Sequence, residues 1–303
     1  MTKVKVGAGF KPAPTKEDTN LKMLCHLCQS EQSRELFENN GHRYVQCGQC
    51  GLIARSRIES AQAASEYQSD LYQQQQSSHD LERRSAIFRP ALDELAALRQ
   101  PGRLLDVGCG DGLFLKLAAD QGWQSHGIEL SPMAVQQARR RLGGPDGRII
   151  CDEVSQAHFT DGYFDVVTLF NVLDQVARPM DQLREIHRVL KPGGLLIVRV
   201  PNAEFHVTLL RLSKSLAPQL VVHLYSFSAA TLRAALERAG FGAIRVTNSP
   251  LTPGDPYGAL PLLGARGMEV IKGTVYAAAQ TVAALSGGRV LLGPSLTVRA
   301  VKS

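Results

Sequence analysis

The middle of the chain carries an acidic residue followed by evenly spaced glycines, a combination that can bind a small ligand. Asp106 lies in the apolar segment 104–107, and Gly108, Gly110 and Gly112 follow it. Glycine has no Cβ atom, so a turn built from these residues lets backbone N–H groups approach a ligand closely. A dinucleotide-binding fingerprint would need a further glycine at position 113, where the chain has leucine. The carboxylate of Asp106 would repel a pyrophosphate but would suit a ligand with an ammonium or sulfonium group.

Further acidic residues follow two other apolar segments. Residues 124–129 are predicted to form a strand ending at Glu129, whose carboxylate could accept hydrogen bonds from both hydroxyls of a ribose. Residues 148–151 are predicted to form a third strand, and Asp152 and Glu153 come directly after it. Loops often carry binding residues, so both acids are candidates for ligand contact. Two exposed loop acids without a role are the alternative.

These segments resemble the class I S-adenosylmethionine-dependent methyltransferases, whose first motif has the form Asp-x-Gly-x-Gly-x-Gly. The apolar strand at residues 164–170 and the Leu-Lys-Pro-Gly-Gly turn at residues 190–194 extend the resemblance. It implies an α/β fold of the Rossmann-like methyltransferase type, a doubly wound, seven-stranded, mostly parallel sheet with helices on both faces. The implied strand order is 3-2-1-4-5-7-6. A near-continuous apolar strand such as 164–170 is what a parallel sheet covered on both faces requires.

The resemblance also implies which residues bind S-adenosylmethionine. Glu129 would hold the ribose, and Asn171 would help to hold the methionine end of the cofactor. Asp152 is the first candidate to bind the adenine amino group, and Glu153 is the second. The cofactor-binding candidates are Asp106, Gly108, Cys109, Gly110, Gly112, Glu129, Leu130, Asp152, Glu153 and Asn171. Residues 174–175 depart from the family, because they are Asp-Gln where Glu-His is common, so the imidazole at that place is missing.

A histidine further along the chain is the candidate catalytic base. His223 begins the phrase His-Leu-Tyr-Ser-Phe-Ser at residues 223–228, just before a predicted helix. This phrase resembles one in family members that carry an N-terminal four-cysteine ribbon, and it implies a loop near the acceptor pocket. An imidazole there could take a proton or position the substrate. A structural hydrogen bond made by His223 is the alternative.

Four of the six cysteines form two Cys-x2-Cys pairs with 18 residues between them: Cys25, Cys28, Cys47 and Cys50. Two pairs at this spacing can surround one Zn²⁺ with four thiolates, and four protein ligands leave no open position, so the metal would be structural. The segment that holds these cysteines is too small to build a sufficient hydrophobic core without a bound metal ion. A redox-active Cys-x-x-Cys is the rival interpretation. The other two cysteines, Cys109 and Cys151, are expected to be small packing residues.

The elements that would position these residues fall into consecutive segments. We expect a disordered lead-in at residues 1–20, a zinc ribbon at 21–57, a helical linker or lid at 58–100, and the methyltransferase domain at 101–303, with inserts at about 203–222 and 248–295. Ser131 with Pro132 predicts one helix start, and Ser228 predicts another.

The composition indicates a globular protein. The 303 residues include 44% hydrophobic and 20% charged residues, and no apolar run reaches the roughly 18 residues of a membrane span. No apolar segment follows the lysines near the start, so we expect no signal peptide and a cytoplasmic location. The net charge of +6 would suit a phosphorylated or anionic-lipid-linked substrate or nucleic acid, but a solvated basic surface is the better explanation.

The resemblance implies transfer of a methyl group from S-adenosylmethionine to a small-molecule acceptor, such as a sugar, lipid-linked or natural-product hydroxyl or carbon. One alternative is an RNA methyltransferase that uses the ribbon to bind nucleic acid, but basic and acidic residues alternate in the ribbon rather than forming a basic stripe. Another is a non-catalytic scaffold that binds S-adenosylmethionine. A helix within 203–222 could also contact a membrane surface.

Overall fold

The computed structural model describes residues 11–12, 24–39, 41–58, 81–98, 100–143, 148–212, 223–250 and 265–303. Most of the expected lead-in at 1–20 lies outside the described residues. So do residues 59–80 of the expected linker and the parts 213–222 and 251–264 of the two expected inserts.

A seven-stranded sheet forms the centre of the molecule, in the order β11-β12-β9-β8-β5-β6-β7. Its strands are β5 (Arg103–Val107), β6 (Gln124–Ile128), β7 (Ile149–Ile150), β8 (Phe164–Phe170), β9 (Leu190–Pro201), β11 (Phe241–Asn248) and β12 (Ser295–Lys302). Neighbours from β7 through β9 pair in parallel, whereas β12 is antiparallel to both β9 and β11. Numbered along the chain, this order is 3-2-1-4-5-7-6, so the expected topology is confirmed.

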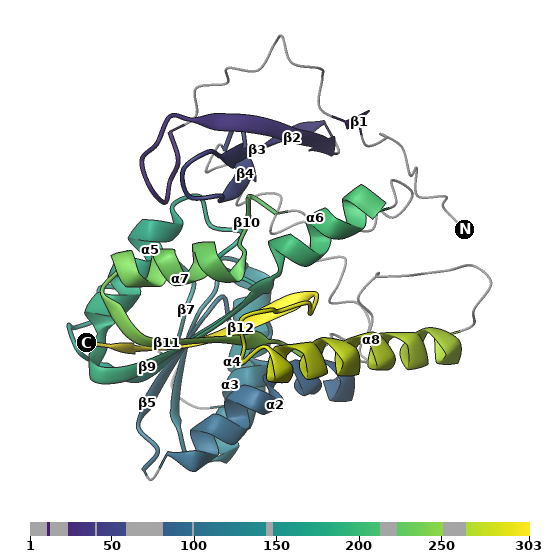
Figure 1. Ribbon diagram of the computed structural model, residues 1–303. Helices are drawn as coiled ribbons and strands as arrows, with labels where there is room; N and C mark the ends of the chain where they lie inside the picture. Colours follow the sequence, from purple (N-terminus) through teal and green to yellow (C-terminus); the bar gives the residue numbers. More distant parts are fainter. Residues whose placement is uncertain are drawn as a thin grey trace, which may run out of the picture.

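Helices cover both faces of this sheet (Figure 1). The helices are α2 (Leu81–Ala97), α3 (Leu113–Asp120), α4 (Pro132–Leu142), α5 (Pro179–Val189), α6 (Ala203–Leu212), α7 (Ala229–Arg238) and α8 (Ala265–Leu285). Helices α5 and α7 pack on one face, and α2, α3 and α4 pack on the other. Ser131 caps α4 with Pro132 at its first position, and Ser228 forms a capping box with Thr231 on α7, as the sequence predicts.

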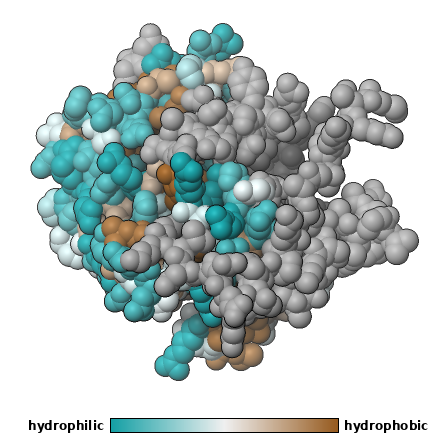
Figure 2. Space-filling model, turned by 90° about the horizontal axis from the view of Figure 1, so that it is seen from above, coloured by the Kyte–Doolittle hydropathy of each residue, from teal (hydrophilic) through white to brown (hydrophobic). Residues whose placement is uncertain are grey.

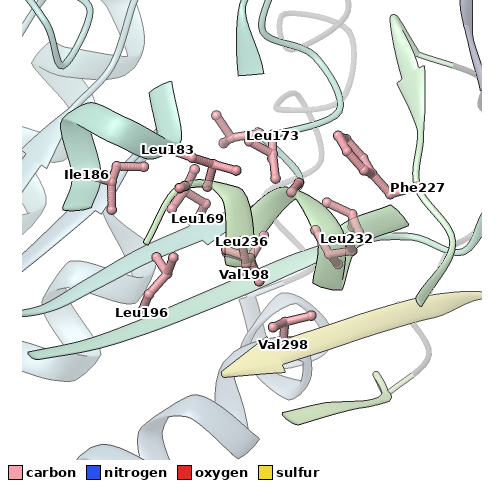
Figure 3. Close-up of a cluster of buried hydrophobic side chains, with 14 of the residues drawn as sticks. Leu169, Leu173, Leu183, Ile186, Leu196, Val198, Phe227, Leu232, Leu236 and Val298 are labelled. Carbon is pink, nitrogen blue, oxygen red and sulfur yellow. The ribbon is translucent and has the colours of Figure 1, made fainter. Parts of the chain in front are cut away.

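Successive residues of the central strands point into two separate hydrophobic clusters. Leu104 belongs to the cluster beneath α3, whereas its neighbour Leu105 belongs to the cluster beneath α5 and α7. Figure 3 shows the second cluster, in which Leu183 of α5 lies next to Leu169 of β8 and Leu236 of α7 lies next to Val198 of β9. Because side chains alternate across a strand, a strand that feeds two cores must be apolar at nearly every position.

A smaller sheet lies above the first (Figure 1) and joins residues that are far apart in the sequence. Its order is β1 (Lys11–Pro12), β2 (Ser33–Asn39), β3 (His42–Cys47), β4 (Ile53–Arg55) and β10 (Tyr225–Ser226). Strand β10, which the sequence places in a loop, pairs antiparallel with β4. The backbone N–H groups and carbonyls along the free edge of β4 thereby find partners.

The ribbon and the central sheet share one core. The cluster beneath α5 and α7 also contains Cys25, Leu27, Cys47 and Leu52 of the ribbon. The ribbon expected at residues 21–57 therefore packs onto the rest of the chain and shares part of its core with the central sheet.

On the face seen from above, the described part of the surface is largely hydrophilic with separate hydrophobic patches (Figure 2). Among the described residues, we find no helix with both the length and the apolar character needed to cross a bilayer.

Candidate active site

A cavity of about 210 Å³ lies at the carboxyl ends of β5, β6 and β7, next to α5. The strand ends and the loop after β7 provide Val107, Gly108, Ile128, Glu129, Leu130, Asp152, Glu153, Val154 and Ser155. The segment after β8 and helix α5 provide Val172, Gln175, Val176, Ala177, Arg178, Asp181, Gln182 and Glu185. These lining residues include five acids but only one arginine. The cavity therefore favours a ligand that carries positive charge.

The glycine turn shapes one wall of this cavity. Gly108 lines it with a φ of +73°, and a Cβ atom at this position would lie 2.3 Å from Cγ2 of Val172. A Cβ atom at Gly112 would lie 2.9 Å from the Cα atom of Ala138 in α4. Any side chain at these two positions would push the turn away from its neighbours, so only glycine lets the backbone pass this close.

Glu129 is fixed at the floor of the cavity. It is 1% exposed, and its Oε2 accepts a hydrogen bond from the Gly110 N–H at 3.0 Å. Its Oε1 accepts from the Ser131 N–H at 2.9 Å. Each carboxylate oxygen can accept a further bond, so a ligand with adjacent hydroxyl groups can bind without displacing the two backbone donors. The glycine turn and the second strand end are therefore held together by one carboxylate.

Asp106 lies beneath the turn and is not among the residues that line the cavity. It is buried, and its Oδ1 accepts a hydrogen bond from the Thr168 hydroxyl at 2.7 Å. Burial raises the pKa of Asp106 to about 8; the Glu129 charge raises it too, and the Thr168 hydroxyl opposes the shift. The structure thus places a carboxyl that is mostly protonated at neutral pH behind the turn, and not against the ligand.

The raised pKa of Asp106 predicts a pH-dependent stability. The unfolded chain releases this proton near the ordinary pKa of 3.8, whereas the folded protein keeps it until about pH 8. Between these values the folded state binds the extra proton, so the free energy of unfolding should fall as the pH rises, by at most about 1.4 kcal/mol per pH unit. Asp106→Asn, which can still accept from Thr168, removes the titration. Urea unfolding of both proteins across this range checks the prediction, and a stability difference that does not vary with pH would contradict it.

The other cofactor-binding candidates differ in their placement. Leu130 lines the cavity, and so do Asp152 and Glu153, which are exposed. The side chain of Cys109 is buried against Gly127. A Cβ atom at Gly127 would lie only 2.7 Å from the Sγ atom of Cys109. Gly110 and Gly112 shape the turn without lining the cavity. Cys151 is exposed, so the expectation that it packs in the core is wrong.

Asn171 is held by protein contacts beside the cavity. It has a left-handed φ of 59°, and its Oδ1 accepts a hydrogen bond from Nη1 of Arg199 at 2.6 Å. Its backbone carbonyl accepts a hydrogen bond from Nε2 of Gln175 at 2.6 Å. Asn171 is not among the lining residues, and the cofactor contact expected there remains a prediction.

The segment between β8 and α5 brings His223 next to an acid that sequence reasoning did not select. Nε2 of His223 lies 3.7 Å from Oδ2 of Asp174, whose side chain is almost fully buried. Two residues beyond His223, the Tyr225 N–H donates to the backbone carbonyl of Asp174 at 3.0 Å. Sequence reasoning treated Asp174 only as part of a departure from the family motif. The signal it missed is an acid that follows the apolar pair Val172-Leu173, a few residues after a central strand.

The four ribbon cysteines converge on one point. Their Sγ atoms all lie within 4.8 Å of one another; the Cys25–Cys50 and Cys28–Cys47 distances are 3.5 and 3.4 Å. Thiolates about 2.3 Å from a tetrahedral zinc lie about 3.8 Å apart, which fits this spacing. All four cysteines are free of disulfide bonds. Their donor set and geometry therefore suit a structural zinc ion.

A hydrogen-bonded tyrosine links this cluster to the wall of the cavity. His26, between the first two cysteines, lies with its Nδ1 2.9 Å from the Tyr225 hydroxyl. The same hydroxyl donates to the backbone carbonyl of Ala177, a cavity-lining residue, at 2.9 Å. Tyr225 lies 199 positions from His26 along the chain, so this contact could not be identified without the fold.

Comparison with known proteins identifies the family of this architecture. A family model described as a methyltransferase domain matches residues 79–246. A ubiquinone biosynthesis O-methyltransferase from Pseudomonas aeruginosa is 35% identical over 115 residues, which cover 37% of this chain and 49% of that protein. A protein of the same name from Xanthomonas oryzae pv. oryzae is 38% identical over 105 residues, which cover 33% of this chain and 43% of that protein. The chain thus spans about half the length of the curated relatives it matches.

Solved structures share the fold. The complex between the Haloferax volcanii Trm112 methyltransferase activator and a methyltransferase matches with a TM-score of 0.53 and 19% identity, covering 80% of this chain and 97% of that one. At this level of identity the match supports the architecture alone.

Proposed function

The chain belongs to the methyltransferase domain family, and from this premise we propose that it transfers a methyl group from S-adenosylmethionine to a small-molecule acceptor. The observation that carries the proposal is the acid-lined cavity in which Gly108 forms a wall and Glu129 is fixed at the floor. A buried carboxylate held by two backbone donors suits a ribose, and the surrounding acids suit a cationic ligand.

Different residues of this chain would bind different parts of the cofactor. Glu129 would accept hydrogen bonds from the ribose hydroxyls, while Asp152 and Glu153 would border the adenine on the loop after β7. When bound, S-adenosylmethionine supplies a methyl group already activated by the positive charge on its sulfur. The protein then contributes chiefly by holding the acceptor in line with that methyl group and by excluding water.

A small molecule is the acceptor class that we favour. Support comes from the relatives named ubiquinone biosynthesis O-methyltransferases, although the match covers about half of their length. Incubating cell extract with the protein and radiolabelled S-adenosylmethionine should place label in the small-molecule fraction. Label found only in RNA or protein would contradict this acceptor class.

We also propose that Cys25, Cys28, Cys47 and Cys50 bind one structural zinc ion. Four thiolate ligands fill a tetrahedral zinc completely, so the metal would hold the ribbon together without taking part in the chemistry. The ribbon in turn supplies β4, on which β10 is paired.

Calorimetry tests the cofactor assignment directly. We expect the purified, zinc-loaded protein to bind S-adenosylmethionine and S-adenosylhomocysteine with micromolar affinity. The cavity offers Glu129 to hold the ribose and an acidic lining around it. NAD serves as the control, since the chain has leucine where the dinucleotide fingerprint requires glycine. The absence of binding heat with both sulfur nucleosides would refute the proposed function.

A further inference from the structure

Asp174 is a buried acid whose environment lacks the usual compensation. Its side chain is 2% exposed, and neither carboxylate oxygen accepts a hydrogen bond from another described residue. Burial raises the pKa of Asp174, while the nearby charges of His223 and Arg199 lower it. A buried carboxyl without a hydrogen bond destabilises a protein, so its presence points to a partner that approaches during function.

His223 is the group best placed to be that partner. Its Nε2 lies 3.7 Å from Oδ2 of Asp174, about 0.8 Å beyond the length of a charge-assisted hydrogen bond. Catalytic hydrogen bonds are often this long before the substrate binds. The other charged neighbour, Arg199, already donates to the Asn171 side chain at 2.6 Å and to the Ser249 hydroxyl at 2.8 Å. Nearby His206 is buried, and this burial lowers its pKa to about 4, so it is neutral at physiological pH.

The pair lies beside the proposed cofactor cavity and is held from two sides. Val172 and Gln175, which flank Asp174 in sequence, both line the cavity. The backbone carbonyl of Asp174 accepts from the Tyr225 N–H, and Tyr225 belongs to β10, which is paired with β4 of the ribbon. The chain that carries His223 is thus fixed to the same segment that carries Asp174.

We propose that Asp174 is a positioning residue that holds His223 with a proton on Nε2, which leaves Nδ1 to take the proton of a hydroxyl acceptor. The proposal rests on the proposed function and narrows its acceptor class to molecules that react through an O–H group. As the acceptor oxygen bonds to the methyl carbon, the carbon–sulfur bond breaks and its electron pair leaves on sulfur. The hydroxyl proton passes to Nδ1 of His223, and the carboxylate of Asp174 stabilises the resulting imidazolium.

The protonated nitrogen of His223 can be read by NMR without knowing the acceptor. In the full-length, zinc-loaded protein labelled with ¹⁵N-histidine, the His223→Gln variant identifies the His223 signals among those of the eight histidines. We expect the wild type to show the signal of the Nε2–H tautomer, because the Asp174 carboxylate 3.7 Å away favours a proton on that nitrogen. Asp174→Leu should abolish that N–H signal, whereas Asp174→Asn, which keeps an acceptor oxygen, should retain it. Asp161→Asn, a substitution of a mostly exposed acid, should leave the signal unchanged.

Several results would overturn the proposal. An Nδ1–H tautomer in the wild type would leave no lone pair to accept the proton, and this measurement needs no variant. A signal that persists unchanged in Asp174→Leu would show that Asp174 does not hold His223. Leucine replaces a buried, uncompensated carboxyl, so we expect this variant to fold. Calorimetry with S-adenosylmethionine on the same variant separates the two proposals, because the cofactor should still bind if only the His223 contact is lost.

Discussion

Replacing Cys47 with serine should remove the zinc ion from the protein and release the strand that carries Tyr225. Structural zinc supplies most of the folding free energy of units this small, about 10–16 kcal/mol in isolated zinc-finger peptides. Without it, β4 should no longer present an ordered edge to β10. We expect the Arg55 amide, which donates to the backbone carbonyl of Leu224 at 2.9 Å, to exchange with solvent orders of magnitude faster than in the wild type. Metal analysis and hydrogen exchange measure both effects.

Cys151→Ser is the matched control, because Cys151 is exposed and lies outside the cluster of four cysteines. It should keep one zinc ion per chain and the wild-type exchange rates. The cofactor cavity lies at the strand ends of the central sheet, so Cys47→Ser should still bind S-adenosylmethionine. Its affinity should be lower than that of the wild type, because the cavity-lining residue Ala177 loses the hydrogen bond from Tyr225. An unchanged zinc content in Cys47→Ser would refute the zinc site.

Glu129→Gln should weaken the binding of S-adenosylmethionine by about tenfold to about a hundredfold. Hydrogen bonds to a charged group contribute about 1.5–3 kcal/mol, and each 1.4 kcal/mol is a factor of ten in affinity. The glutamine NH₂ group would also face a backbone N–H, either that of Gly110 or that of Ser131, and leave it without an acceptor. The substitution should therefore both remove the negative charge at position 129 and make the glycine turn less ordered.

Calorimetry measures the affinity of this variant, and urea unfolding measures its stability, so the two effects can be separated. Glu237→Gln on α7 is the control, since Glu237 is exposed and is not among the residues lining the cavity. It should bind the cofactor as the wild type does. Wild-type affinity in Glu129→Gln would mean that the ribose is held elsewhere, and the role assigned to Glu129 would then be wrong.

Local patterns predict the central sheet well because they report directly on local physics. The apolar run 164–170 requires burial on both faces, and the structure places β8 between β5 and β9 in the middle of the sheet. Gly108 and Gly112 are predicted to form a turn and do so, because a Cβ atom at either position would collide with a neighbour. The capping residues Ser131 and Ser228 begin α4 and α7 as predicted. Each of these features depends on a few adjacent residues.

The candidate site is predicted less completely, because it depends on contacts between distant segments. Asp106 has the right spacing for a ligand contact, yet the fold buries it against Thr168. The carbonyl of Asn171 accepts a hydrogen bond from Gln175. Asp174 becomes a candidate functional residue only because the fold brings His223 beside it. A residue type at a strand end indicates a site, but which atoms face the ligand depends on packing behind it.

By itself the sequence determines the glycine turn, the acid at the end of the second strand and the four-cysteine spacing, whereas the strand order is implied by the resemblance to a known family. Each is encoded by residues close together in the chain or by a fixed spacing. Only the tertiary structure decides that the ribbon shares its core with the central sheet, that β10 completes the ribbon's sheet, and that His223 faces Asp174. The physical reason is that strand edges and buried charges select their partners in space, where residues some 50 to 170 positions apart become neighbours.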